Sequence, residues 1–230
     1  MMKATRCTAR LSVAGLSLAL AALLAGLVAP AAAQDEIPLP LKLPRAAFAG
    51  TPKEIPEGVE DVEPMDPERK NPMVPAGIKQ LALNKPVTSA NPPYNGELKI
   101  ITDGEKEAYE DTLVELRPRT QWVQIDLGAE HKLYQIAIWH FHLEPIIVHD
   151  VIVQISNDPE FKTGVTTLFN NDRDNSSGLG VGTDREYWES NMGKLVAAKA
   201  TKARYVRTYA RGSTYTDPLN RYTEIEVWGL

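Results

Sequence analysis

Four histidines fall within one short stretch of the sequence, and their spacing suggests a binding site. They are His131, His140, His142 and His149. Residues two apart on a strand share one face, so two of the four would lie side by side. Imidazoles beside an aromatic ring and a carboxylate can hold a sugar by hydrogen bonds and stacking, or a transition metal. The alternative is a set of half-buried histidines bonded to local backbone. We predict a ligand site formed by His140, His142, His149, Trp139 and Glu144.

A second polar cluster lies in the segment 169–178. Its alternating polar residues are Asn170, Asp172, Asp174 and Ser176. Alternating oxygen ligands occur in calcium loops of the EF-hand type. However, the sixth position counted from Asp172 is Ser177, where an EF-hand needs glycine, and the twelfth is Thr183 rather than glutamate. We therefore interpret the segment as a plain polar loop.

The motifs of two common enzyme classes are not present in the sequence. The glycine-rich segment 178–182 is followed by Thr183 where a dinucleotide fingerprint needs glycine, and no βαβ pattern surrounds it. No G-x-S-x-G motif indicates an activated serine. With 30 acidic residues in the chain, some pair of neighbouring carboxylates is inevitable, so such a pair does not predict a glycosidase. We expect a protein that binds rather than catalyses.

The beginning of the chain has the order of a secretory signal. Basic residues come first, an apolar run follows, and small residues end it: Lys3, Arg6, Arg10, residues 16–28 and residues 31–33. This order predicts a signal peptide over residues 1–33 with cleavage before Gln34. An uncleaved membrane anchor is the alternative, because the apolar run is nearly long enough to span a bilayer.

Removal of the signal changes both the redox chemistry and the charge of the chain. It takes away Cys7, the only cysteine, so the mature protein would have no disulfide and no thiol nucleophile. The formal net charge is −5, and the signal contains basic but no acidic residues, so the mature chain is more acidic still. Such a surface does not favour nucleic acid or anionic lipid, and it suits a divalent cation better. We expect an exported protein, periplasmic or extracellular, with no membrane span after cleavage.

Residues 34–77 differ in composition from the rest of the mature chain. More than half of the 17 prolines lie here, among several acidic residues. Proline lacks an amide donor and is unfavourable in helix interiors and central strands. We predict a proline-rich tether, largely irregular. Its apolar residues could still dock on the domain surface, and these are Leu39, Leu41, Leu43 and Phe48.

From residue 78 to residue 230, short apolar runs alternate with turn residues. The clearest runs are residues 122–127, 133–143, 150–156, 204–209 and 224–228. Period-two alternation rich in Val, Ile, Tyr and Trp, ended by Gly, Asn, Asp or Pro, is typical of strands. We predict one all-β domain over residues 78–230, an antiparallel β-sandwich. If residues 133–143 and 148–156 pair as a hairpin, His142 lies opposite His149.

Several of these segments, taken in order, resemble a known family. They are LNKPVTS at 83–89, ITDG at 101–104, WVQIDLG at 122–128, VIVQISND at 151–158, RYVR at 204–207 and EIEVWG at 224–229. Together they resemble the discoidin domain, also called the coagulation factor 5/8 type C domain, one of the galactose-binding-like jelly rolls. The resemblance implies a jelly-roll sandwich without catalytic activity. It also implies that glycans or cell-surface ligands bind to loops at one end of the sandwich.

The resemblance further implies a structural calcium ion. In the family, the aspartate of an Asp-Gly turn, a nearby hydroxyl residue and the first glutamate of the closing strand supply side-chain oxygens. Here they correspond to Asp103, Thr112 and Glu224. Calcium takes six to eight oxygen ligands, so these residue types fit. The loop after Asp103 is longer than in the family, by residues 107–111, and lacks its tryptophan. The alternative is that Asp103 forms a turn and Glu224 is a solvated strand residue.

Two other functions are kept beside the binding of a glycan or cell-surface ligand. A module with a proline-rich segment and no catalytic domain also suits an envelope protein that assembles with other proteins. A small exported hydrolase is the less favoured alternative. Glycan binding without turnover would distinguish the first function from the other two.

Overall fold

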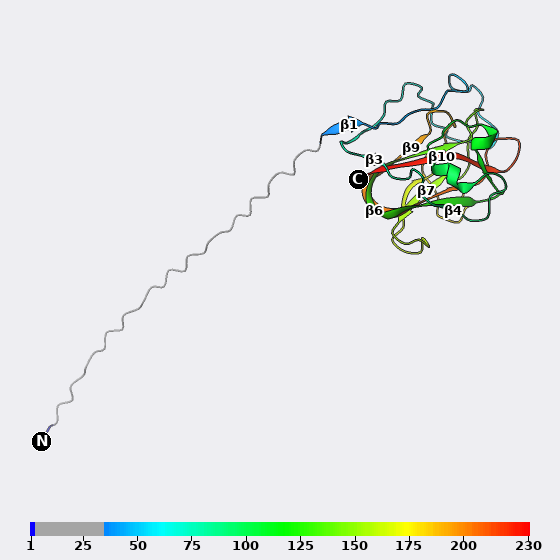
Figure 1. The fold of residues 1–230 in the computed structure, drawn as a ribbon. Helices are drawn as coiled ribbons and strands as arrows, with labels where there is room; N and C mark the ends of the chain where they lie inside the picture. Colours follow the sequence, from blue (N-terminus) through cyan, green and yellow to red (C-terminus); the bar gives the residue numbers. More distant parts are fainter. Residues whose placement is uncertain (3–34) are drawn as a thin grey trace. The chain divides into compact units, whose positions relative to one another are not determined.

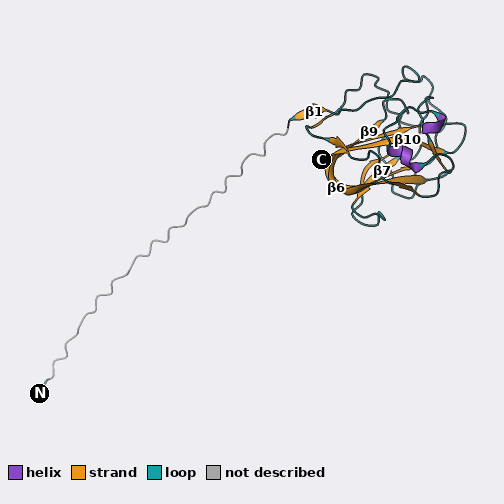
Figure 2. Cartoon of the chain, in the orientation of Figure 1, coloured by secondary structure: helices purple, strands orange, loops and turns teal. Residues whose placement is uncertain are grey.

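The structure is a computed structural model that describes residues 1–2 and 35–230. Regular structure in this part of the chain is almost entirely β-strand, with two short 3-10 helices (Figure 2). In chain order the elements are β1 (Glu36–Pro38), β2 (Met73–Pro75), β3 (Lys79–Gln80), β4 (Val87–Ser89), η1 (Leu98–Thr102), η2 (Glu110–Thr112), β5 (Val114–Leu116), β6 (Gln121–His140), β7 (Ile152–Ser156), β8 (Thr166–Asn170), β9 (Lys194–Ala210) and β10 (Asn220–Gly229). The predicted all-β fold class is confirmed.

The predicted signal peptide of residues 1–33 and its cleavage site before Gln34 lie almost wholly outside the described residues. Within residues 1–2 and 35–230, no helix combines the length and the apolar character needed to cross a membrane. Export therefore stays a prediction.

Two long strands, β6 and β9, connect the two layers of the sandwich. They pair antiparallel along most of their length, with a register shift between Asp126 and His131. Gly128 lies in this interval at φ +87°, a backbone conformation that glycine adopts freely. The first half of β6 and the second half of β9 join β4, β7 and β8 in one layer, here called the β4 layer. The other halves join β3, β5 and β10 in the β10 layer (Figure 1).

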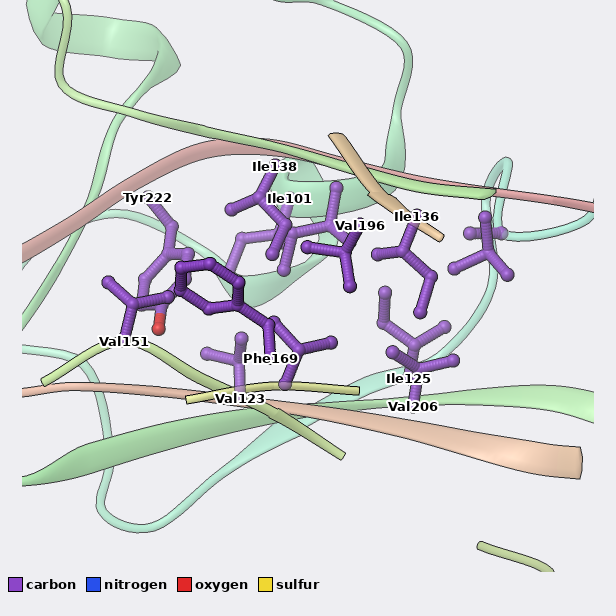
Figure 3. Close-up of a cluster of buried hydrophobic side chains, with 14 of the residues drawn as sticks. Ile101, Val123, Ile125, Ile136, Ile138, Val151, Phe169, Val196, Val206 and Tyr222 are labelled. Atoms are coloured by element: carbon purple, nitrogen blue, oxygen red, sulfur yellow. The ribbon is translucent and has the colours of Figure 1, made fainter. Parts of the chain in front are cut away.

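The core lies between these two layers and follows the alternation of the strands. Val123 and Ile125 enter it from the β4 layer, and Ile136 and Ile138 enter it from the β10 layer (Figure 3). All four side chains are fully buried. Burial of each such side chain stabilises the fold by about 1.5–3 kcal/mol relative to exposure. The packed core therefore fixes the strand ends, from which the loops of the candidate sites extend.

Residues 35–77, here called the N-terminal strap, pack against the outer face of the β10 layer. The second half of β6 is apolar on both faces, and Ala137 and Trp139 lie on the face opposite the core. Leu39 and Val74 of the strap are both 1% exposed and cover this face together with Trp228. Figure 1 shows the strap, in blue to cyan, as a mostly irregular chain beside the sandwich.

The strap is largely irregular, as predicted, and Leu39 and Leu41 dock on the domain, which the prediction had left open. Its regular structure consists of the three-residue strands β1 and β2, which pair antiparallel. The strap also makes polar contacts with the loop before β9, since Arg69 donates to the carbonyl oxygen of Gly193 at 2.7 Å. The cause is the apolar outer face of β6, whose side chains leave water when the strap packs on them. The prolines of the strap do not prevent this packing.

The predicted hairpin between residues 133–143 and 148–156 is not formed. β6 pairs with β4, β9 and β10, whereas β7 pairs with β8 and β9. Residues 141–151 instead form a loop that carries the chain from the β10 layer to the β4 layer, with isolated bridges from Ile147 to Trp188 and from Val148 to Ser213. A short connection favours a hairpin, but here both edges of the second half of β6 are already occupied by β9 and β10.

The closing strand β10 runs from one end of the sandwich to the other. It begins beside the loop after β9, where the Gly212 amide donates to Asn220 Oδ1 at 2.6 Å. It ends at Gly229, which pairs with Lys79 of β3, so the C-terminus lies beside β3 (Figure 1). The start of the strap is also at this second end, because the Ala76 amide donates to the carbonyl oxygen of Asp35 at 2.7 Å.

Candidate functional site

The structure buries two of the predicted ligand histidines. His140 has its Nδ1 2.7 Å from Glu189 Oε1, and its ring packs against Tyr222 with centroids 4.6 Å apart. His142 has its Nε2 2.8 Å from the carbonyl oxygen of Lys106. Both histidine side chains are fully buried, so a ligand at the surface does not reach them. The predicted role of His140 and His142 is corrected accordingly.

Trp139 and Glu144 are not brought together with a histidine either. Trp139 lies beneath the strap and donates from Nε1 to the carbonyl oxygen of Asn191 at 3.0 Å. Its ring fills the space beside Gly193, where an added Cβ would come within 2.6 Å of the ring. Glu144 is exposed in the loop after β6. The predicted convergence of Trp139, Glu144 and the histidines therefore does not occur, because the hairpin behind that prediction is absent.

His149 is the predicted ligand residue that does border a cavity. It is half-buried, and its Nδ1 lies 3.3 Å from Glu186 Oε1. The cavity has a volume of about 330 Å³ and is here called the polar pocket. Its lining residues are Gly58, Glu60, His149, Asp150, Asn171, Arg173, Asp174, Ser176, Glu186 and Arg211. A ligand role for His149 stays a prediction.

The polar pocket is formed where strands end. Asp150 precedes β7, Asn171 and Asp174 follow β8, and Arg211 follows β9. Asp150 holds a positive φ of 53°, a conformation that is uncommon for residues with a side chain and that aspartate adopts more readily than most. The loop after β8 is ordered by Asp172, which accepts hydrogen bonds from the backbone amides of Ser176 and Ser177.

Three carboxylates lie close together at this pocket. Asp150, Asp172 and Asp174 each have an oxygen, and these oxygens all lie within 4.8 Å of one another. Burial raises the pKa of Asp150, and the nearby charges of Asp172 and Asp174 raise it further. A hydrogen bond from the Ser176 hydroxyl and the charge of Arg211 act in the opposite direction. The net result is a pKa of Asp150 above its usual value.

Asn171 contributes an unsatisfied donor to the polar pocket. Its Oδ1 accepts from the Val151 amide at 2.6 Å, which fixes the orientation of the side-chain amide. Its Nδ2 is buried and has no hydrogen-bond partner, and the residue is only 3% exposed. A buried donor without a partner costs about 1–3 kcal/mol. The pocket is therefore suited to a ligand that presents an oxygen to this amide.

The predicted metal residues lie at a different place, between β10 and the loop after η1. Glu224 is fully buried, and within residues 1–2 and 35–230 neither of its carboxylate oxygens has a hydrogen-bond donor in bonding geometry. Burial raises the pKa of Glu224 to about 9. The backbone amide of Gly104 and the ammonium of Lys106 offset part of this shift, whereas Glu226 and Asp103 add to it. The alternative of a solvated Glu224 is therefore wrong.

The two other predicted metal residues differ in their placement. Asp103 is exposed, close enough to Glu224 to raise its pKa, and accepts from the Glu105 amide at 2.8 Å. Thr112 uses its hydroxyl locally, to donate to the carbonyl oxygen of Glu107 and to accept from the Tyr109 amide. Thr112 makes no hydrogen bond to Glu224, whose oxygens are unpartnered. Asp103 is thus linked to Glu224 only through its charge, and Thr112 is bonded within its own loop.

The sequence interpretation missed most of the polar pocket. It noted the alternation of Asn170, Asp172, Asp174 and Ser176 but treated the segment as a plain loop. The signal that was present is a run of oxygen-bearing side chains directly after a buried strand. Asp150 and Arg211 are distant in sequence from this run, and only the pairing of β7 with β8 and β9 brings them to it.

Comparisons with known proteins give likenesses of structure alone. No family model and no curated protein match the chain. A carbohydrate-binding module of AlyQ, solved with 4,5-unsaturated mannuronic acid, is 18% identical with a TM-score of 0.45, over 62% of this chain and 92% of that one. A chitosan-binding module from Paenibacillus sp. IK-5 is 20% identical with a TM-score of 0.45, over 66% and 99%. A Streptococcus pneumoniae fucose-binding module is 15% identical with a TM-score of 0.46, over 66% and 98%.

Proposed function

We propose that this chain is a non-catalytic carbohydrate-binding module that holds a glycan in the polar pocket. The observation that supports this most directly is the arrangement of donors and acceptors around one cavity of about 330 Å³. Asp150, Asp174 and Glu186 offer acceptor oxygens, and Asn171 and Arg211 offer donors. A sugar hydroxyl both donates and accepts, so adjacent hydroxyls match such an alternating wall. A sugar oxygen that reaches the Asn171 amide would accept a hydrogen bond from its Nδ2.

The test is a glycan array on the purified chain, followed by calorimetry with the best ligand. Arg211→Ala removes a charged donor from the rim and is expected to weaken binding about 10- to 100-fold, the equivalent of a hydrogen bond to a charged group. His149→Ala should weaken it less. Glu144→Gln is the matched control, because Glu144 is exposed and lies outside the pocket lining. Equal binding by Arg211→Ala, His149→Ala and the parent would remove the pocket from the proposal.

The same experiment separates the alternatives. Release of shorter sugars from the bound glycan would indicate a hydrolase. A protein partner that co-purifies with the exported chain, together with an array that shows no glycan, would favour assembly in the envelope. The proposal of export rests on the predicted signal, and a mature N-terminus at Gln34 in protein recovered outside the cytoplasm would support it.

We further propose a structural calcium ion at Glu224 and Asp103. Two buried carboxylate oxygens without a donor fit a cation, and the raised pKa of Glu224 describes the cost of leaving that charge uncompensated. Bound calcium would supply that compensation and would stabilise the folded chain, since only the folded chain forms the site. Thr112, predicted as a third ligand, is left out because its hydroxyl is bonded locally.

A further inference from the structure

The three carboxylates at the polar pocket have few positively charged neighbours. Carboxylates that are close together disfavour one another's ionisation. The nearest cation is Arg211, whose guanidinium lies 3.8 Å from Asp150 Oδ2 and is partly exposed. Arg173 borders the pocket but pairs with Asp61 of the strap. The cluster of Asp150, Asp172 and Asp174 therefore has more negative charge than its neighbours neutralise.

The cluster also keeps unused coordination capacity. Each carboxylate has about four lone-pair sites. Asp172 uses its oxygens for the amides of Ser176 and Ser177 and for the Ser177 hydroxyl. Asp174 accepts from the Ser176 amide at 2.9 Å, and Asp150 accepts from the Ser176 hydroxyl. Asp150 and Asp174, which border the cavity, keep most of their lone pairs free.

The ligand atoms indicate which kind of cation would fit. All three are carboxylate oxygens, which suit a hard cation and not a soft transition metal. Magnesium prefers a strict octahedron with few carboxylates and several waters, whereas calcium accepts irregular sets of six to eight oxygens. Three carboxylates on two separate loops, open to a cavity, fit calcium better.

Asn171 is an independent indication that something more than a cation binds here. Asn171 lines the same cavity as Asp150 and Asp174, and its buried Nδ2 has no partner among the described residues. A cation cannot satisfy an N–H donor, but an oxygen that coordinates the cation can accept from it. A sugar with a vicinal diol or a carboxylate presents two neighbouring oxygens, one for the cation and one for this donor.

We propose that calcium binds Asp150, Asp172 and Asp174 and directly coordinates the glycan, whose oxygen also accepts from Asn171. The inference deepens the proposed carbohydrate-binding function and rests on it for the identity of the organic ligand. It assigns the ligand class as glycans with adjacent free hydroxyls or uronic carboxylates. The cation site is separate from the one at Glu224, since the two use different residues on different loops.

The cation site is tested with calcium chloride alone, by calorimetry on chelator-treated full chain. The parent should bind two ions, and Glu224→Gln should keep the pocket site. Asp150→Asn and Asp174→Asn in the Glu224→Gln background should lower the remaining affinity at least about tenfold. Asp172 is not substituted, because it orders its loop. Glu144→Gln, an exposed carboxylate outside the pocket lining, is the control and should change nothing. Unchanged affinity in both cluster variants would overturn the cation site.

The bridging role is tested with the glycan selected on the array. The parent should lose binding in EDTA and recover it with calcium. Asn171→Asp keeps the acceptor for the Val151 amide but replaces the donor, so it should retain calcium and lose the glycan at least about tenfold. Glycan binding that persists in EDTA would overturn the bridge while leaving the proposed function intact. Calcium binding without any glycan on the array would overturn the proposed function and the bridge, and would leave only the cation site.

Discussion

The buried Glu224 permits a quantitative prediction from one conservative change. Glu224→Gln keeps the shape of the side chain and removes its charge. The pKa of Glu224 is raised from 4.5 to about 9 by burial. Between those two values the folded chain holds a proton that the unfolded chain releases, so the stability of the parent falls as pH rises from 4.5 to 9. The variant lacks this dependence.

The magnitude follows from the size of the shift. Each unit of pKa shift corresponds to about 1.4 kcal/mol. At pH 7 and without calcium, the parent is therefore expected to be less stable than Glu224→Gln by about 3 kcal/mol, and the difference should vanish below pH 4.5. For a chain of this size, that corresponds to about 6–12 °C in melting temperature. Asp103, Lys106 and Glu226 face Glu224 in both proteins, so their own titration largely cancels in the comparison.

The assay is urea denaturation of both proteins in EDTA at several values of pH, repeated with saturating calcium. Calcium at about 1,000 times its dissociation constant would stabilise the parent by about 4 kcal/mol, so the order of the two proteins should reverse. Glu144→Gln makes the same chemical change at an exposed position and should leave stability within about 0.5 kcal/mol. A difference between parent and Glu224→Gln that is the same at every pH would refute the reasoning, and no effect of calcium on the parent would remove the ion from Glu224.

Three further predictions concern packing and the histidines. Gly193→Ala should lower the free energy of unfolding by about 1–3 kcal/mol in urea denaturation, because the new Cβ meets the Trp139 ring at 2.6 Å and the backbone has φ +60°. Leu39→Ala should cost about 2–5 kcal/mol and speed proteolysis of the strap; equal cleavage of the parent would show that the strap is not held. His142→Ala should lower the melting temperature, because it leaves a cavity at a buried position. His149→Ala should weaken glycan binding with little effect on the melting temperature. The reverse pattern would contradict the burial of His142 and the position of His149 at the pocket.

The sequence predicted the strands well because local alternation reports which face of a strand is buried. Val123 and Ile125, and Ile136 and Ile138, alternate with other residues, and all four enter the core. The sequence did not predict that residues 121–140 form one strand. Gly128 is typical of the end of a strand, but in this structure the strand bends at Gly128 and continues into the other layer. It also did not predict the pairing of β6, since pairing partners are far apart in sequence and depend on the whole sheet.

The candidate sites were predicted only where a motif included the residues. Asp103 and Glu224 were selected because their positions match the family segments, and their role as calcium ligands stays a prediction; Thr112 sits in an insertion with its own hydrogen bonds. Trp139 was expected at a binding surface, since nothing local shows that the strap covers it. Asp150 was not singled out because its partners follow β8, and no spacing rule links it to them.

The direction of β10 determines which end of the domain points away from a support to which its C-terminus is attached. A strand of ten residues spans about 30 Å, and β10 begins beside the loop that contributes Arg211 and ends beside the C-terminus. An anchor, tag or sensor surface coupled at Leu230 would therefore hold every copy with the polar pocket outward. Copies oriented alike on one surface can engage several residues of the same polysaccharide at once, so weak single contacts would add up to firm retention.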